Sequence, residues 1–147
     1  MKTTLLAVIL TMAGWHAHAQ KSEVFAPEGK ALKGYDAVAF FRDAGPVKGA
    51  DSLSFSYKGV DWLFANQDHL DAFRTNPEAY IPQYGGYCAY GTSEGHKAPT
   101  EADTWTIIDN KLYFNYSRKV QKAWLKNRDE RIRQADTQWP LIKDKPR

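Results

Sequence analysis

The sequence predicts a small α+β domain with two β-hairpins and several short helices. Two observations carry this prediction. Short apolar or alternating segments occur in pairs joined by two-residue turns, which is typical of β-hairpins. Each pair is followed by apolar residues at helical spacing, and Asn66 and Ser117 stand where a helix N-cap is expected. We expect one domain over residues 20–147, with its C-terminal helices packed on the rest.

The first nineteen residues resemble a signal peptide. Lys2 precedes an apolar run at residues 5–12, and Ala17-His18-Ala19 forms a cleavage site before Gln20. The run is too short to cross a bilayer, which takes about 20 apolar residues. We therefore expect a periplasmic or secreted protein without stable membrane insertion. The alternative, a buried N-terminal helix, is less favoured because of the cleavage site.

The elements of the first half follow from local pattern. Residues 37–41 are a short apolar run and are expected to form a buried strand. Residues 53–57 alternate apolar and polar side chains, and after the Lys58-Gly59 turn the chain is expected to return as a strand over residues 60–65. Asn66 then predicts a helix over residues 67–75.

The second half contains a second hairpin and two helices. Strands are expected at residues 105–108 and 112–116, around an Asp109-Asn110 turn. Ser117 predicts a helix to about residue 127, and a last helix is expected at residues 129–137, stopped by Pro140. Between the halves, residues 84–91 are rich in glycine and tyrosine and show no clear period.

Charge and motifs exclude several classes of function. The net charge is +3, with basic residues concentrated after residue 110 and acidic residues before it. This asymmetry would suit a polyanion, but solvated helix faces explain it more simply, and no nucleic-acid motif accompanies it. No phosphate loop, nucleophile elbow or zinc-protease motif is present. We therefore expect no nucleic-acid partner and favour a protein that is not an enzyme.

A resemblance to a known family covers residues 33–140. The segments that carry it are GYDAVAFF (34–41), YKG (57–59), WLFAN (62–66), NPEAY (76–80), QYGGYCAYG (83–91), WTIID (105–109) and LYFNY (112–116). Together they resemble the YHS domain, in an exported bacterial branch. The resemblance implies a small α+β fold and, in its metal-handling members, a thiolate site.

The chain departs from that thiolate pattern. The resemblance would place cysteines around Asp36 to Val38, at Ala65 and at His69, and none is present there. Thiolates make such a site suitable for copper or zinc, so the family's metal binding is not carried over. The remaining soft ligands are Cys88, His69 and His96, whose spacing fits no compact metal motif.

Cys88 is the single cysteine and leaves three alternatives open. It is a small buried residue, a reactive thiol, or a copper or zinc ligand together with His69 or His96. The residues around it form a candidate ligand-binding or redox segment: Tyr84, Gly85, Gly86, Tyr87 and Tyr90. Glycines 85 and 86 permit close approach of a ligand, or simply a sharp turn between packed elements.

Three functional hypotheses follow from these residues. The one we favour is a non-catalytic binding module for an unknown protein or small ligand, using the tyrosine- and glycine-rich segment. The second is a periplasmic thiol redox protein centred on Cys88. The third is a copper- or zinc-binding protein that uses Cys88 with His69 or His96.

Overall fold

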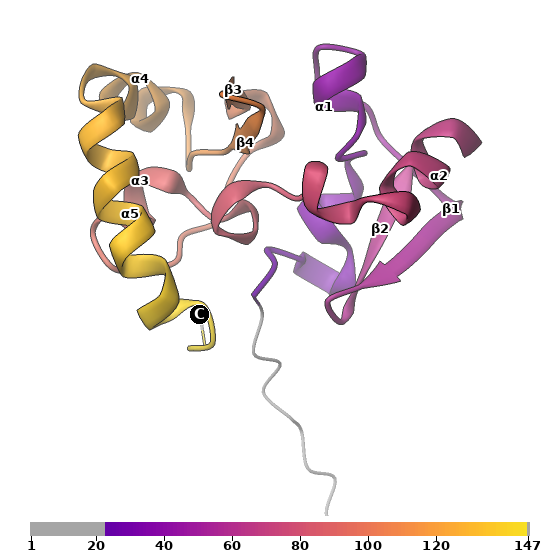
Figure 1. Ribbon diagram of the computed structural model, residues 1–147, viewed down its shortest axis with the longest axis horizontal. Helices are drawn as coiled ribbons and strands as arrows, with labels where there is room; N and C mark the ends of the chain where they lie inside the picture. Colours follow the sequence, from indigo (N-terminus) through magenta and orange to yellow (C-terminus); the bar gives the residue numbers. More distant parts are fainter. Residues whose placement is uncertain (1–22, 147) are drawn as a thin grey trace, which may run out of the picture.

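The computed structural model describes residues 23–146, so the expected signal peptide lies outside the described residues. Two lobes lie side by side (Figure 1). The N-terminal lobe comprises residues 23–81 and holds the first hairpin, and the C-terminal lobe comprises residues 82–146 and holds the second hairpin and the longest helix. The predicted α+β class, with two antiparallel hairpins and short helices, is confirmed.

The N-terminal lobe is built around one hairpin and one helix. Strands β1 (Ala50–Tyr57) and β2 (Val60–Phe64) pair antiparallel around the expected turn, with Tyr57 opposite Val60. Helix α2 (Gln67–Thr75) follows. The remaining elements are helix α1 (Ala39–Arg42) and the 3₁₀ turns η1 (Pro27–Gly29), η2 (Ala31–Gly34) and η3 (Pro77–Ala79).

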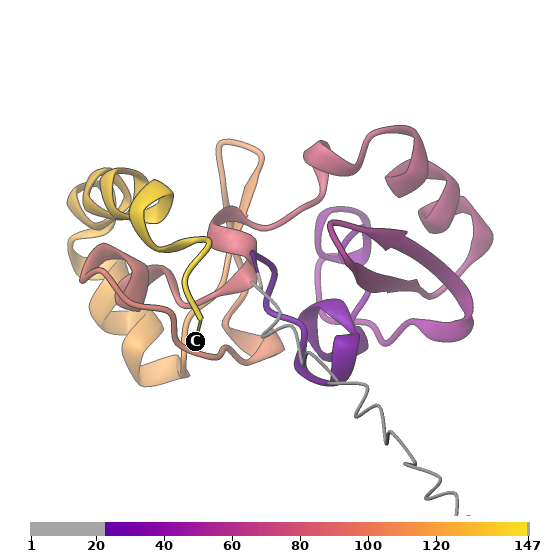
Figure 2. The same cartoon turned by 90° about the horizontal axis from the view of Figure 1, so that it is seen from below.

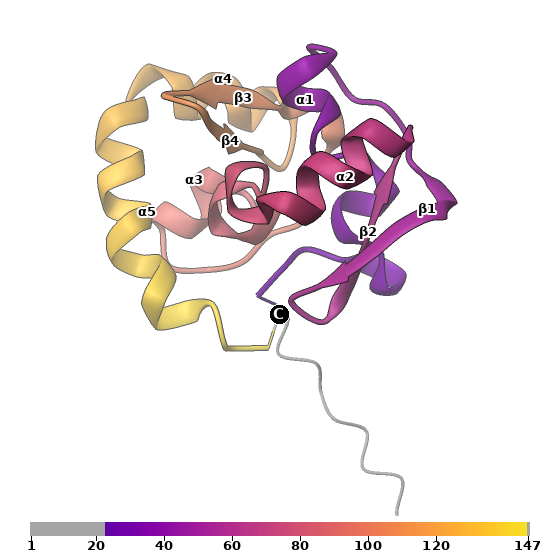
Figure 3. The ribbon, with the colours of Figure 1, turned by 45° about the vertical axis from the view of Figure 1, so that its right-hand side comes forward.

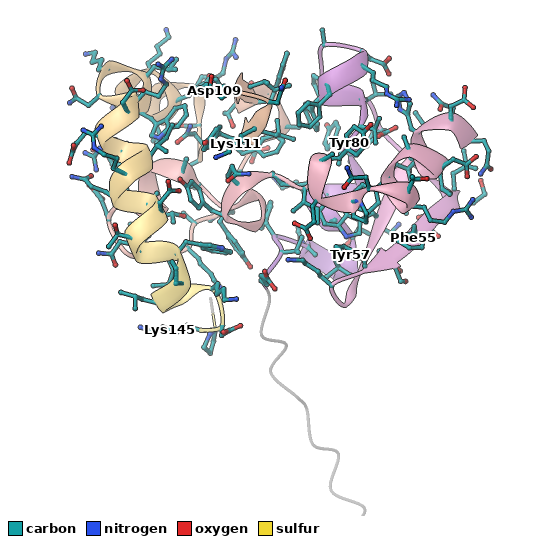
Figure 4. The ribbon with its side chains drawn as sticks, in the orientation of Figure 1. Phe55, Tyr57, Tyr80, Asp109, Lys111 and Lys145 are labelled. Carbon is teal, nitrogen blue, oxygen red and sulfur yellow. The ribbon has the colours of Figure 1, made fainter. Side chains whose placement is uncertain are left out.

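Helix α2 packs on the hairpin through one aromatic side chain. The Asn66 side chain accepts a hydrogen bond from the His69 amide at 2.9 Å, which begins the helix where the sequence predicts it. Phe73 then faces the hairpin, and its ring contacts those of Phe55, Tyr57, Trp62 and Phe64. Figure 4 shows Phe55 and Tyr57 beside α2, on the strand that this helix covers.

The predicted strand at residues 37–41 is wrong, because the chain forms helix α1 there. The Asp36 carboxylate accepts hydrogen bonds from the amides of Val38 and Ala39, at 2.8 and 3.1 Å. These two bonds satisfy amides that a helix start leaves without partners, so they favour a helical turn over an extended segment. The run is buried as expected, but as a helix.

The C-terminal lobe combines a short hairpin with three helices. Strands β3 (Thr106–Ile108) and β4 (Lys111–Tyr113) form the predicted second hairpin. Helix α3 (Ala89–Ser93) packs against α5 (Arg128–Ile142), and α4 (Arg118–Lys126) joins both, as Figures 1 and 3 show. The 3₁₀ turns are η4 (Gln83–Gly86) and η5 (Ala102–Thr104).

Helix α5 continues through Pro140, where the sequence predicts an end. Proline has no amide hydrogen, so the Asp136 carbonyl has no donor four residues later in this helix. The next turn still forms, because the Lys143 amide donates to the Trp139 carbonyl at 2.9 Å. Buried Ile142 holds this last turn against the protein, which offsets the bond that Pro140 cannot make.

The second hairpin joins two hydrophobic clusters. Leu112 and Phe114 belong to the cluster of the N-terminal lobe, whereas Tyr113 between them belongs to the cluster of the C-terminal lobe. Because successive residues of a strand point to opposite faces, one short segment serves both clusters. Within residues 23–146, no helix is long and apolar enough to span a membrane.

Candidate functional site

Cys88 is sealed inside the C-terminal lobe. It directly precedes helix α3, and its side chain is 2 % exposed. The Gly91 amide donates to its sulfur at 3.4 Å, and the sulfur lies 3.6 Å from the Asn115 side-chain oxygen. That oxygen also accepts from the Tyr90 amide at 3.2 Å, which fixes the orientation of the Asn115 amide group. The thiol therefore donates its hydrogen to Asn115.

Burial raises the pKa of the Cys88 thiol, although backbone amides of Gly91, Tyr116 and Tyr90 oppose the shift. The thiolate is the nucleophile and the metal ligand, so a higher pKa lowers both reactivities at neutral pH. A side chain that is 2 % exposed also has little access to a reagent or a partner thiol. Packing and chemistry together are those of an inert core thiol.

The tyrosine- and glycine-rich segment is mostly interior. Tyr84 and Tyr87 are 4 % and 1 % exposed, and their rings contact Trp139 of α5. Both glycines have positive φ, at 60° for Gly85 and 87° for Gly86. A Cβ atom on Gly85 would lie 1.8 Å from the Glu23 carbonyl oxygen, so this glycine allows close packing of the chain on itself.

Tyr90 is the most accessible of the three tyrosines and is already engaged. The Arg131 guanidinium lies 3.9 Å from the centre of the Tyr90 ring. The same guanidinium donates to the Tyr90 hydroxyl at 2.8 Å. The three tyrosines thus serve packing between η4, α3 and α5, and of the predicted segment only Tyr84 and Gly85 line a cleft.

His69 belongs to a buried network centred on Asp36. The carboxylate is fully buried, and one of its oxygens accepts from the Ala65 amide at 2.8 Å and from His69 Nδ1 at 2.7 Å. A carboxylate that accepts from three backbone amides can take only an N–H from the imidazole, so Nδ1 carries the proton. The other ring nitrogen, Nε2, lies 3.9 Å from the Asp43 carboxylate.

His96 is exposed, and its Nε2 atom lies over Gly91, 3.1 Å from where a Cβ atom would stand. No three His, Cys, Asp or Glu side chains of residues 23–146 are arranged to hold a metal ion. Cys88, His69 and His96 are therefore not brought together as one ligand set. The donor atoms near His69 are oxygen and nitrogen, without the thiolates that soft metals prefer.

A cleft of about 250 Å³ opens between the two lobes. Figure 2 shows the separation of the lobes from below, with the first described residues running between them. Its walls come from the first described residues, the β1–β2 turn, the segment from η3 to η4, and the C-terminal half of α5. The residues that carry its chemistry are Glu23, Lys58, Glu78, Tyr84, Asp136 and Trp139.

The wall from the N-terminal lobe holds a small ion network. The Lys58 ammonium lies 2.9 Å from Glu23 and 3.8 Å from Glu78. Burial lowers the pKa of Lys58, but the hydrogen bond to Glu23 and the two carboxylate charges outweigh this effect and raise it overall. The Tyr57 hydroxyl donates to Glu78 at 2.9 Å. Lys58 is the one cation among the residues that line the cleft.

The wall from the C-terminal lobe holds a carboxylate next to aromatic rings. Tyr84 donates its hydroxyl hydrogen to Asp136 at 2.9 Å, and the Tyr84 and Trp139 ring centres are 6.1 Å apart. Burial, the bond to Asp136 and its charge all raise the pKa of Tyr84, so this phenol stays protonated. Within residues 23–146, no Lys, Arg or His nitrogen lies within 4.0 Å of the Asp136 carboxylate.

Sequence reasoning found Tyr84 and Gly85 of this cleft but missed its charged residues. The local sequence indicates one pair of cleft residues: Asp136 and Trp139 are three residues apart, which places both on one face of α5. No family model matches the chain, and no curated protein or solved structure is significantly similar to it.

Proposed function

We propose that this protein is an exported, non-catalytic binding module that holds a small ligand in the cleft between its lobes. The observation that carries the proposal is the cleft itself. It combines charged side chains and aromatic rings from four segments of the chain around one space of about 250 Å³. Most ligand pockets measure about 300–1,000 Å³, so a smaller ligand than a typical drug molecule fits.

The proposal retains the binding hypothesis from the sequence but assigns binding to the cleft instead of the whole tyrosine- and glycine-rich segment. The predicted contact segment contributes Tyr84 and Gly85 to the cleft, while Tyr87 and Cys88 lie behind the wall as packing. The cleft shows no nucleophile held by a base and no oxyanion hole. A recognition site accounts for its residues better than a catalytic one does.

The arrangement around Asp36 supports membership of the YHS family. The positions where the resemblance would place cysteines, around residues 36–38, at Ala65 and at His69, come together in space. In this protein a carboxylate, a backbone amide and an imidazole form hydrogen bonds with one another at these positions. We infer that this member has replaced a metal-binding arrangement by a structural hydrogen-bond network.

The redox and metal alternatives have less support. A thiol redox function would need Cys88 to ionise and meet a partner, and its burial and raised pKa oppose both. Copper or zinc binding would need further ligands beside Cys88 or His69. The ring of His69 is already bound to Asp36 on one side.

A fragment-binding experiment tests the proposal. The ¹⁵N-labelled protein is titrated with anionic, neutral and cationic fragments of up to ten heavy atoms, and the Trp139 indole signal reports on the cleft. At least one class should shift this signal saturably, and Cys88→Ala should respond like the parent. Gln83→Trp, which fills the cleft, should abolish the response, whereas Gln134→Trp on the outer face of α5 should not.

Two results would count against the proposal. One is the absence of any saturable shift at Trp139 with all three fragment classes. The other is a folded Cys88→Ala variant that no longer responds, which would show that ligand binding depends on the Cys88 thiol.

A further inference from the structure

We infer that the ligand of this cleft is a small organic cation with an aliphatic ammonium group, an inference that rests on the proposed binding function. Three carboxylates line the cleft, from Glu23, Glu78 and Asp136, and one ammonium, from Lys58, faces them. The lining therefore carries an excess of negative charge. A cationic ligand would balance that charge, whereas an anionic one would be repelled.

Asp136 is the carboxylate with capacity to spare. Lys58 lies between Glu23 and Glu78, so these two share a cation already. Asp136 has the neutral Tyr84 hydroxyl as its partner, and one hydroxyl leaves most of the carboxylate's acceptor sites open. Pro140 adds a second acceptor, because it leaves the Asp136 carbonyl without its helical donor. An ammonium group has three N–H donors for such acceptors.

An ammonium group of the protein itself lies near Trp139, outside the lining of the cleft. The Lys97 side-chain nitrogen lies 5.8 Å from the centre of the Trp139 ring and 5.1 Å from that of Tyr87. It also donates to the carbonyls of Lys143 and Lys145, at 2.6 and 2.8 Å. Lys97 is not part of the lining. Trp139 also lines the cleft, so attraction between a cation and its ring is available to a ligand there as well.

The chemistry favours an organic amine over a metal ion. The carboxylates stand on different walls, and no three of the described carboxylates, imidazoles or thiols converge on one point. A metal ion needs converging ligands at about 2.0–2.6 Å. Carboxylates on separate walls suit an elongated ligand with an ammonium group at each end, because the Glu23–Glu78 wall carries one negative charge more than Lys58 balances.

Three probes of equal length separate charge from shape. Butane-1,4-diamine, butane-1,4-diol and succinate are titrated into the full mature protein, with the Trp139 indole signal as readout. The diamine should bind saturably, and the diol and succinate should bind at least about tenfold more weakly, since hydrogen bonds to charged groups contribute about that factor or more. Binding of the diamine should weaken as salt is raised.

Matched variants test the assigned residue. Asp136→Asn should weaken diamine binding by about two- to fivefold, because the carboxylate is exposed, and Glu78→Gln should also weaken it. Asp129→Asn removes the same charge from the same helix at a carboxylate that is paired with Arg128 outside the cleft, and should leave binding unchanged. Equal weakening in Asp129→Asn and Asp136→Asn would show general charge attraction and overturn the inference.

The same titrations separate this inference from the proposed function. Saturable binding of succinate or the diol in place of the diamine would overturn the cation and keep the binding module. Absence of diamine binding at millimolar concentration would also overturn it, and the wider fragment set then decides the proposed function alone. Nα-acetyl-lysine methylamide distinguishes the source of the ammonium: tighter binding than the diamine would identify a lysine side chain of a partner.

Discussion

Removing the Asp36 carboxylate should destabilise the protein more than any other single loss of a polar side chain described above. Asp36 is fully buried and accepts four hydrogen bonds, from the amides of Val38, Ala39 and Ala65 and from His69 Nδ1. Asp36→Ala leaves four donors without that acceptor. Each buried donor left unpaired costs about 1–3 kcal/mol, and the costs are not additive because the chain relaxes.

We therefore expect Asp36→Ala to lower the free energy of unfolding by about 3–5 kcal/mol, which is less than the sum over four unpaired donors because the chain relaxes. Total stabilities of single domains are about 5–15 kcal/mol, so a large share would be lost. Asp36→Asn should cost less, because its oxygen still serves Val38 and Ala39 while its amide group faces the Ala65 amide. Urea unfolding followed by tryptophan fluorescence measures both.

The control is Asp51→Ala, which removes a carboxylate that is 77 % exposed and paired with Lys30. Its unfolding midpoint should match that of the parent protein, since exposed ion pairs contribute little. A loss below about 1 kcal/mol in Asp36→Ala, with an unchanged urea dependence, would refute the reasoning, because it would mean that water replaces the carboxylate at little cost.

Three further predictions concern the C-terminal lobe. Iodoacetamide at pH 8 should label Cys88 in urea but not in the folded protein, and rapid labelling of the folded protein would contradict its burial. Gly85→Ala should cost about 3 kcal/mol or more in urea unfolding, because its Cβ would meet a backbone oxygen at 1.8 Å, whereas Gly59→Ala, with open space around it, should cost about 1 kcal/mol. The raised pKa of Tyr84 means that its phenol ionises in the unfolded chain first, so stability should fall as the pH rises above about 10. Tyr84→Phe should show a shallower fall in unfolding titrations over that range, and an equal fall would exclude this phenol as the cause.

Elements that depend on neighbouring residues could be predicted from the sequence. The Asn66 and Ser117 side chains accept from the His69 and Val120 amides, and both helices begin at these caps as expected. The Lys58-Gly59 turn likewise fixes the first hairpin, with positive φ at both residues. In each case the atoms that decide the structure lie within four residues of one another.

Predictions failed where a distant partner or a tertiary contact decides the outcome. Residues 37–41 suit a strand by composition, but Asp36 captures their first amides and is itself held by Ala65 and His69, about thirty residues away. Pro140 stops an isolated helix, but burial of Ile142 carries α5 past it. The charged cleft needs four segments in place, so no spacing along the chain announces it.

Strand β4 and the residue after it pack into the hydrophobic clusters of both lobes and so hold the lobes together. Rotating either lobe away from the other would expose Leu112 and Phe114 on one side of the strand or Tyr113 on the other. A hinge between the lobes would thus be opposed by the burial of large apolar side chains. The cleft should therefore have the same width with and without a bound ligand. Ligands would then be selected by a site that is formed before binding, and neither binding nor release would need a closing motion.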